Sequence, residues 1–131
     1  MYTRNSDIVF GDIVNLTPHV VTLMRENGDV VDYHPSGIVA RVQTNYVQRM
    51  ELDGFPLSEI QYGEIELSNE TDWVDLIGNH CDNLYIVSAI VANAARNTNH
   101  PLKNYCISPD TGNGAVRVDG KIVGVRGWTV Y

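Results

Sequence analysis

The stretch LYIVSAIVANAARN, Leu84 to Asn97, decides the fold class because it changes character partway along its length. Its first four residues form an apolar run typical of a buried strand. The following segment has the alanine content and spacing of a short helix, with Ser88 placed to cap its first turn. A helix that begins directly after a buried strand presents free amides at the carboxyl end of that strand, where anions are commonly held.

Upstream of this unit, short apolar runs alternate with turn signals. Pro18 divides two of these runs and predicts a bend or an edge, because proline donates no hydrogen bond to a sheet. Asn27-Gly28 favours a hairpin with a type I′ turn, and Leu52 to Gly54 predicts another reversal. These signals predict an antiparallel meander in the first half of the chain. Its strands are expected at residues 13–16, 20–24, 30–33, 38–42 and 60–67, with Val47 onward as an extension.

The remaining segments complete the expected fold. Residues 68–83 are polar and irregular and predict a surface connection that holds one helical turn at Trp73 to Leu76. Residues 115–118, the Asp119-Gly120 turn and residues 122–130 predict a final hairpin. We therefore expect an α+β fold with an antiparallel β-sheet core and one or two short helices in the C-terminal half. With 131 residues, the chain is predicted to be a single domain over residues 1–131, with a flexible start at about residues 1–10.

Composition narrows the classes of partner. A net charge of −7 argues against a long nucleic acid, whose binding depends on many basic contacts to phosphate. No apolar run is long enough for a membrane-spanning helix and no secretory signal is visible, so we expect no membrane contact and a cytosolic location. Cys81 and Cys106 have no metal-binding spacing and are expected to be buried thiols. No metal and no cofactor are predicted.

The segment SPDTGNGAVR, Ser108 to Arg117, is a candidate binding loop. It places free backbone N–H groups, a hydroxyl, a carboxylate and a guanidinium close together, which suits a ribose that carries phosphates. The alternative is an ordinary polar turn between strands, since glycine, asparagine, aspartate and proline dominate turns. Four arginines stand beside apolar or small residues, where each is either an anion-reading group or a solvated surface residue. They are Arg41, Arg96, Arg117 and Arg126.

Catalytic motifs are missing from the sequence. It contains no GxSxG elbow, no Walker loop and no HExxH, and we therefore expect a protein that is not an enzyme. Glu64 and Glu66 form the best acid pair, but a solvated strand face explains them as well. Three histidines, each beside a proline, are better interpreted as turn residues than as general bases. They are His19, His34 and His100. Candidate aromatic platforms for a base, for most of which core packing is the alternative, are Tyr33, Tyr46, Tyr62, Tyr85, Tyr105 and Trp128.

Short motifs follow one another in order over most of residues 13–127. They are VNLTPH at 14–19, PSGIVAR at 35–41, YGEI at 62–65, YIVS at 85–88, PDTG at 109–112, VR at 116–117, Gly120 and GVR at 124–126. This ordered set resembles the Thoeris anti-defence proteins of the first type, a family of phage-encoded sponges that sequester signalling nucleotides. The start before residue 13 and the connection at 68–83 depart from the family pattern.

The resemblance implies binding of cyclic ADP-ribose isomers, and for some members cyclic oligonucleotides, without cleavage, in the cytoplasm of the host. It also implies a dimer made by the C-terminal helical part, with assembly as a homodimer or a homohexamer. The resemblance places Asp110, Thr111 and Arg117 of the loop in the site. Arg117 and Arg41 would bind the pyrophosphate, Asp110 would bind a ribose hydroxyl, and Asn93 would bind an adenine edge or a second hydroxyl. Ser88 marks the anion-holding start of the helix, and the candidates for base stacking are Tyr85, Tyr105 and Trp128.

Two alternatives remain open. One is an enzyme that hydrolyses a cyclic nucleotide, which turnover or a metal requirement would favour. The other is a structural or housekeeping phage protein without a nucleotide ligand, in which the candidate loop is a turn and the arginines are interface residues.

Overall fold

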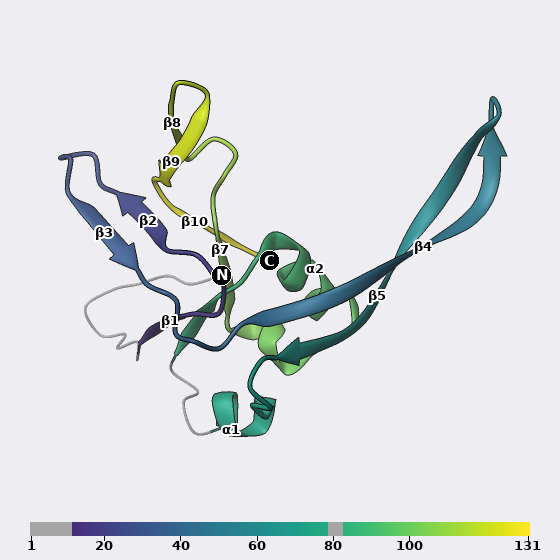
Figure 1. Cartoon of the computed structure of the whole chain (residues 1–131), viewed down its shortest axis with the longest axis horizontal. Coiled ribbons are helices and arrows are strands. Elements are labelled where there is room, and N and C mark those ends of the chain that lie inside the picture. The colour runs from purple at the N-terminus through teal and green to yellow at the C-terminus, as the bar shows by residue number, and fades with distance from the viewer. Residues whose placement is uncertain (1–11, 79–82) are drawn as a thin grey trace.

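The computed structural model describes residues 12–78 and 83–131 (Figure 1). The expected flexible start and Cys81 lie outside these residues. The α+β fold predicted from the sequence is confirmed, with the helices mostly in the C-terminal half. The elements are β1 (Ile13–Asn15), β2 (Val21–Met24), β3 (Val30–Tyr33), β4 (Ala40–Leu52), β5 (Phe55–Leu67), α1 (Trp73–Gly78), β6 (Leu84–Ile86), α2 (Ala89–Asn97), the 3-10 helix η1 (Pro101–Asn104), β7 (Cys106–Pro109), β8 (Ala115–Val118), β9 (Lys121–Val125) and β10 (Trp128–Val130).

One sheet has the strand order β1-β6-β7-β10 and is mixed rather than purely antiparallel. β6 lies parallel to both β1 and β7, whereas β10 runs antiparallel to β7. The parallel pairing arises because α2 and η1 carry the chain back between β6 and β7, as a crossover between parallel strands requires. The strand–helix unit that the sequence predicts at Leu84 to Asn97 therefore forms the centre of the fold.

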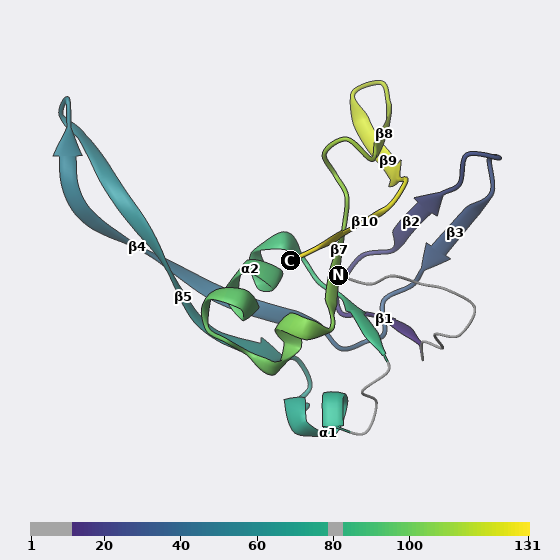
Figure 2. The ribbon, with the colours of Figure 1, turned by 180° about the vertical axis from the view of Figure 1, so that it is seen from behind.

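Helix α2 has the start and the buried face that its sequence predicts. The Ser88 Oγ accepts a hydrogen bond from the Val91 N–H at 3.3 Å, which caps the first turn. Residues at helical spacing on one face are buried, and the helix packs between the base of β4 and β5 and strand β7 (Figure 2). The buried residues of this face are Val91, Ala92, Ala94 and Ala95. Alanine keeps the helix close to both neighbours.

A second sheet, with the order β3-β2-β9-β8, joins two hairpins from opposite ends of the chain. The meander predicted for the first half is wrong, because β1 pairs with β6 and β2 pairs in parallel with β9 at Leu23 and Val125. The β2–β3 hairpin was predicted correctly, but its turn is not type I′. Only Gly28 has a positive φ, of 92°, and the Gly28 N–H donates to the Arg25 carbonyl, as in a type I turn followed by a glycine bulge.

Strands β4 and β5 form a two-stranded arm that projects from the body (Figure 1). The predicted reversal is confirmed at Asp53 and Gly54, which both have positive φ. At the base of the arm, the buried Ala40 and Ile65 belong to the main core beneath α2. Beyond this base, the residues of the arm are mostly exposed.

Asn15 is the main polar residue inside the fold and lies in the VNLTPH motif. Only 2% of Asn15 is exposed. Its side-chain amide donates to the carbonyls of His19 and Tyr33, at 2.7 and 2.9 Å. Its Oδ1 accepts from the N–H and the hydroxyl of Thr17, at 2.9 and 2.7 Å. The motif therefore fixes the bend around Pro18 and ties β1 to the end of β3.

None of the helices among residues 12–78 and 83–131 has both the length and the apolar character needed to cross a bilayer.

Candidate functional site

The Asp110 carboxylate stabilises the predicted binding loop from within. The Asp110 Oδ1 accepts a hydrogen bond from the Gly112 N–H at 3.0 Å. A Cβ atom added at Gly114 would lie 2.8 Å from the Asp110 Oδ2, so the loop closes around this side chain. Asp110 therefore organises a turn, as in the alternative interpretation of the loop, and its Oδ1 is already engaged.

Thr111 and Arg117 have different surroundings in the structure. Thr111 lines a groove of about 180 Å³ whose other walls come from β2 and β9. Arg117 lies on the exposed β8, where its Nη1 donates to the Gly120 carbonyl at 3.2 Å across the hairpin turn. The loop and this arginine are thus not brought into a common hollow by the described residues.

Arg41 and Ser88 lie close together, whereas Arg117, the predicted partner of Arg41 on a pyrophosphate, does not line the same hollow. Arg41 and Ser88 line a hollow of about 380 Å³ at the start of α2, together with Thr17 and Pro18. Asn93 lies on the exposed side of α2, and its backbone carbonyl accepts a hydrogen bond from the Asn97 side chain at 2.8 Å. This hollow combines one guanidinium with the N-terminus of a helix but has no aromatic wall.

Tyr85 does not have the position that a base-stacking residue needs. It is 0% exposed, and its hydroxyl donates to the Leu76 carbonyl at 2.9 Å. Burial raises the pKa of the Tyr85 phenol, an effect that a hydrogen bond with Asn83 opposes. The sequence-based assignment of Tyr85 as a ligand-binding residue is therefore corrected: its ring anchors β6 in the core, and its edge is out of reach of a ligand.

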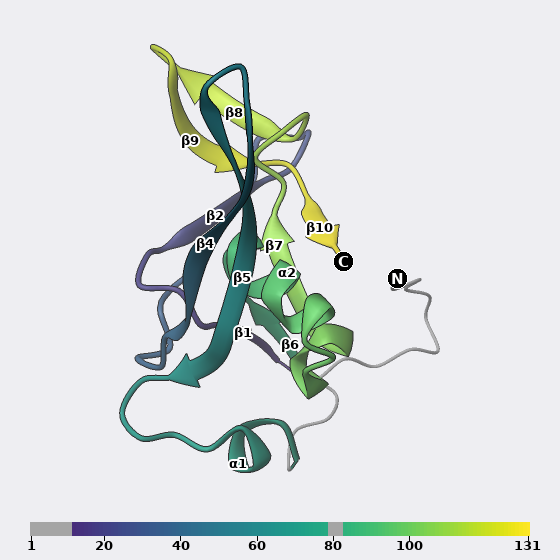
Figure 3. The same ribbon diagram turned by 90° about the vertical axis from the view of Figure 1, so that its right-hand side faces the viewer.

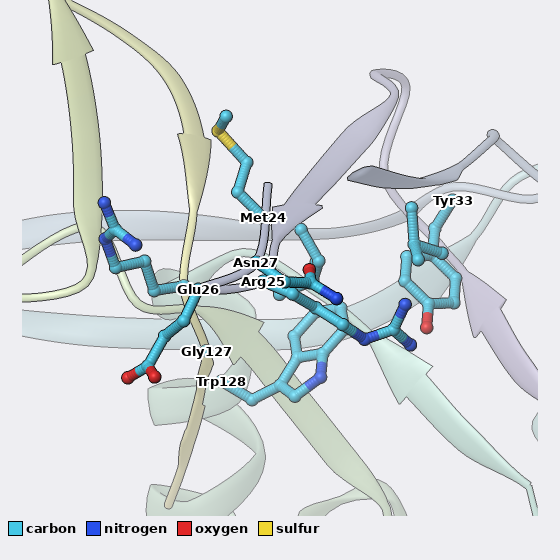
Figure 4. Close-up of a pocket in the computed structure, with 10 residues that line it drawn as sticks. Met24, Arg25, Glu26, Asn27, Tyr33, Gly127 and Trp128 are labelled. Carbon is cyan, nitrogen blue, oxygen red and sulfur yellow. The ribbon is translucent and has the colours of Figure 1, made fainter. Parts of the chain in front are cut away.

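A larger hollow, of about 610 Å³, lies where the β2–β3 hairpin meets the connection from β9 to β10 (Figure 4). It combines two arginines with two aromatic rings, a carboxylate and an amide. Its lining residues are Leu23, Met24, Arg25, Glu26, Asn27, Val31, Tyr33, Arg126, Gly127 and Trp128. We call this hollow the two-arginine pocket.

Sheet pairing explains why the two arginines meet. Leu23 and Val125 are partners in the parallel pair of β2 and β9. Arg25 lies two residues beyond Leu23, and Arg126 lies one residue beyond Val125. Because the strands are parallel, both arginines emerge at the same end of the sheet. Among the described residues, neither guanidinium forms a hydrogen bond or an ion pair.

The predicted loop at Asp110 supports one wall of this pocket. The Arg126 N–H donates to the Gly114 carbonyl at 2.8 Å, and the Asp110 N–H donates to the Gly127 carbonyl at 3.0 Å. These two hydrogen bonds fix the backbone that carries Arg126 and leads into Trp128. The loop therefore supports the pocket through backbone hydrogen bonds, while its side chains are not among the lining residues.

The aromatic wall consists of two rings packed against the core. The rings of Tyr33 and Trp128 are 5.5 Å apart between centroids with an angle of 66° between their planes, an edge-to-face contact. Both residues pack against the small core cluster of Leu84, Ile86 and Ile107. Figure 4 shows the Arg25 side chain extending alongside the Trp128 indole toward the Tyr33 hydroxyl. A planar ligand and an anionic group could thus be held side by side.

The chemistry of this pocket is that of recognition. Its volume lies within the usual range of small-molecule sites, about 300–1,000 Å³. Arginine pairs with phosphate oxygens through two parallel hydrogen bonds, aromatic faces stack on bases, and the Glu26 carboxylate suits sugar hydroxyls. The Asn27 amide is already hydrogen-bonded to Asp29 within its turn. No group of three or more metal-ligating side chains occurs within residues 12–78 and 83–131.

A third hollow, of about 520 Å³, contains Glu64 and His100 and is the best place for acid–base chemistry. His100 has structural contacts there. Its Nδ1 accepts from the Leu102 N–H at 3.0 Å, and its ring meets Trp73 edge to face at 4.7 Å. Burial lowers the pKa of the His100 imidazole. His100 thus caps η1, in agreement with its interpretation as a turn residue.

The sequence points to three residues of the two-arginine pocket, but no signal in it places them together. Arg126, Tyr33 and Trp128 were noted singly, whereas Arg25 was missed because it precedes a segment that signals only a turn. A parallel pair between strands a hundred residues apart leaves no local pattern. No family model, curated protein or solved structure matches the chain.

Proposed function

We propose that this protein binds a cyclic ADP-ribose-type signalling nucleotide in the two-arginine pocket and holds it intact. Such a protein would act as a phage anti-defence sponge in the host cytoplasm, by removing a signal that a host defence enzyme makes. The observation that carries the proposal is the convergence of Arg25 and Arg126 on a pocket walled by Tyr33 and Trp128. The resemblance stated above supplies the ligand class.

The arginines account for the anionic half of such a ligand. A pyrophosphate carries two neighbouring negative groups, and two guanidiniums without described partners can each take one. The wider protein has a net charge of −7, so recognition of an anion requires local positive charge of this kind. Long nucleic acids are disfavoured by the same overall charge.

The aromatic wall of Tyr33 and Trp128 accounts for binding of the base of such a ligand. Stacking of a base on an aromatic side chain contributes about 1–3 kcal/mol. Because Trp128 is held by Tyr33 and by the core cluster beneath it, little side-chain entropy is lost when a base stacks on it. A rigid pocket suits a sponge, which acts by stoichiometric capture and needs an affinity of roughly nanomolar, about −12 kcal/mol.

Calorimetric titration of a cyclic ADP-ribose isomer tests the location of the site. Arg25→Ala and Arg126→Ala are each expected to weaken binding by roughly tenfold to a hundredfold, the value of a hydrogen bond to a charged group. Arg49→Ala is the matched control, since Arg49 lies on the arm in a surface ion pair with Glu59. Unchanged affinity in both pocket variants would contradict the proposed site.

Arg41→Ala distinguishes this pocket from the hollow at the start of α2. Two residues predicted to bind the ligand, Arg41 and Ser88, line that second hollow. If Arg41→Ala abolishes binding while Arg25→Ala and Arg126→Ala leave it intact, the nucleotide occupies the start of α2. Release of a cleaved product in any of these titrations would favour the hydrolase alternative.

A further inference from the structure

We infer that the hollow formed by β5, α1 and the end of α2 binds a small quaternary ammonium molecule, because its lining combines three aromatic rings with one carboxylate. This is the hollow of about 520 Å³ that contains Glu64 and His100, and we call it the aromatic hollow. Its volume lies within the usual range of small-molecule sites, about 300–1,000 Å³. The inference concerns a second site and does not depend on the proposed nucleotide pocket.

Three segments bring the aromatic rings together. Tyr62 comes from β5, Trp73 begins α1, and His100 follows the end of α2. Figure 3 shows β5 passing beside α2 and the chain then leading into α1. Each of the three residues is partly buried, so each is packed against neighbours and keeps some accessible surface. Side chains that are distant in the sequence thus line one hollow.

A β-bulge in β5 orients Tyr62. The pairing register shifts at Gln43 of β4, which is opposed by two residues of β5, Gly63 and Glu64. Residues three apart face opposite sides of a regular strand, but here Tyr62 packs against the core cluster that contains Ile65. A Cβ added at Gly63 would lie 3.3 Å from the Gln43 carbonyl oxygen, so glycine suits the close approach of the strands. The bulge therefore places Tyr62 on the side of β5 that meets the helices.

The protein itself engages the hydrogen-bond donors of Trp73 and Thr98. The Trp73 indole N–H donates to the Ile65 carbonyl at 3.0 Å, and the Thr98 hydroxyl donates to the Ala94 carbonyl at 2.7 Å. The Trp73 ring also meets the His100 ring edge to face, with centroids 4.7 Å apart. What Trp73 offers a ligand is thus its π surface, and Thr98 offers an oxygen that accepts.

The charge of the lining favours a cation. Among the lining residues that the structure describes, Glu64 alone carries a charge, and its carboxylate forms no hydrogen bond or ion pair with them. Burial lowers the pKa of His100 from its ordinary value of 6.5, so the imidazole is neutral at pH 7 and does not repel a cation. The net charge of −7 acts in the same direction at longer range.

The same lining favours an organic cation over a metal ion. Calcium takes about six to eight oxygen ligands, and no group of three or more metal-ligating side chains occurs in the described part of the chain. A quaternary ammonium group instead needs no hydrogen bond and is attracted to aromatic faces, most strongly to tryptophan. Trp73 and Tyr62 supply such faces, and Glu64 supplies the opposite charge.

Titration with choline, followed by the indole N–H signals in NMR spectra, tests the site. The matched ligand is the neutral alcohol in which carbon replaces the choline nitrogen. Because the chain has two tryptophans, the Trp128→Phe variant identifies the Trp73 signal. Choline is expected to shift the Trp73 signal and to bind about tenfold more tightly than the alcohol. Equal binding of the two molecules, no binding of choline, or a shift confined to Trp128 would overturn the inference.

Glu64→Gln tests the carboxylate without disturbing the core, since Glu64 is exposed. This variant should bind choline about threefold to fivefold more weakly and should bind the alcohol as the wild type does. Glu66→Gln is the control, because Glu66 is exposed on the same strand and is not among the lining residues. Unchanged choline affinity in Glu64→Gln, or an equal loss in both variants, would overturn the site.

A peptide that carries trimethyllysine distinguishes the source of the cation. It presents the same trimethylammonium group as choline, but on a polypeptide. The peptide is expected to bind no more tightly than choline, since the lining residues account for the ammonium group alone. Clearly tighter binding of the peptide would overturn the assignment of the site to a free small molecule.

Discussion

Tyr33 and Trp128 meet edge to face with their ring centroids 5.5 Å apart, and this contact joins β3 to β10 in the pocket that Arg25 and Arg126 also line. The two residues come from opposite ends of the chain and from different sheets. Their contact links the β3-β2-β9-β8 sheet to the β1-β6-β7-β10 sheet. The same rings therefore stabilise the fold and form the wall of the proposed nucleotide site.

Trp128→Ala should weaken nucleotide binding by about tenfold or more, since stacking on an aromatic ring contributes roughly 1–3 kcal/mol per base. Trp128→Phe keeps a ring against the core cluster and should retain most of the affinity. Calorimetric titration measures both values, and thermal unfolding separates loss of binding from loss of fold. Equal affinity in the alanine variant and the wild type would remove Trp128 from the site.

Asn15→Ala should lower the free energy of unfolding by about 2–4 kcal/mol, because it removes the hydrogen bonds that Asn15 makes with the Thr17 N–H and with the carbonyls of His19 and Tyr33. Urea denaturation measures this change. Asn27→Ala is the control: Asn27 is exposed and accepts only within its own turn, from the Asp29 N–H at 2.9 Å. The account of the VNLTPH motif as a structural bend fails if both variants are equally stable.

Gly114→Ala should destabilise the protein by about 1–3 kcal/mol, the usual cost of overpacking. The added Cβ would lie 2.8 Å from the Asp110 Oδ2 and 3.0 Å from its Cγ, so the whole side chain must shift. At Gly112 the nearest atom would be 3.4 Å away, and Gly112→Ala serves as the control. Chemical denaturation of the two variants compares them directly; similar midpoints would contradict the packing described for this loop.

His100 should make stability decrease in mildly acidic solution. Burial lowers the pKa of His100 in the folded protein below its ordinary value of 6.5, so the unfolded chain binds the proton more readily. Its contribution is therefore present above pH 6.5 and is lost as the pH falls below that value toward the lowered pKa. Protonation also removes the acceptor for the Leu102 N–H.

The control for this pH dependence is His100→Asn, since asparagine is a good helix cap that does not titrate. Unfolding free energies measured between pH 8 and pH 5 should fall less in this variant than in the wild type. Identical pH profiles would show that another group is responsible.

Local signals in the sequence predicted those parts of the fold that local physics determines. The Ser88 cap, the buried run at Leu84 and the reversal at Asp53 all depend on neighbouring residues and are confirmed. The pairing of β1 with β6 and of β2 with β9 was not predicted, because distant strands of similar composition carry no mark of their partner. The sequence predicts an antiparallel core, and these two pairs are parallel.

In the candidate site, too, the sequence predicts what depends on neighbouring residues and misses what depends on distant ones. Arg41 and Ser88 were each predicted as ligand-binding residues and lie in one hollow, whereas Tyr85 was also predicted to bind the ligand and is buried in the core. Leu84, Tyr85 and Ile86 form one buried strand, and the apolar run did not distinguish a wall facing a ligand from one facing the core. Arg25 and Arg126 became neighbours only through the parallel pair of Leu23 with Val125.

The most direct test of the central claim is a capture measurement with the wild-type protein and the Arg25→Ala, Arg126→Ala double variant. Each is incubated with a cyclic ADP-ribose isomer made by a TIR enzyme, freed of unbound ligand and heat-denatured, and the released material is identified by mass spectrometry. We predict intact nucleotide in stoichiometric amount from the wild type and little from the double variant. Cleaved nucleotide, no retained nucleotide, or equal release from both proteins would contradict the account.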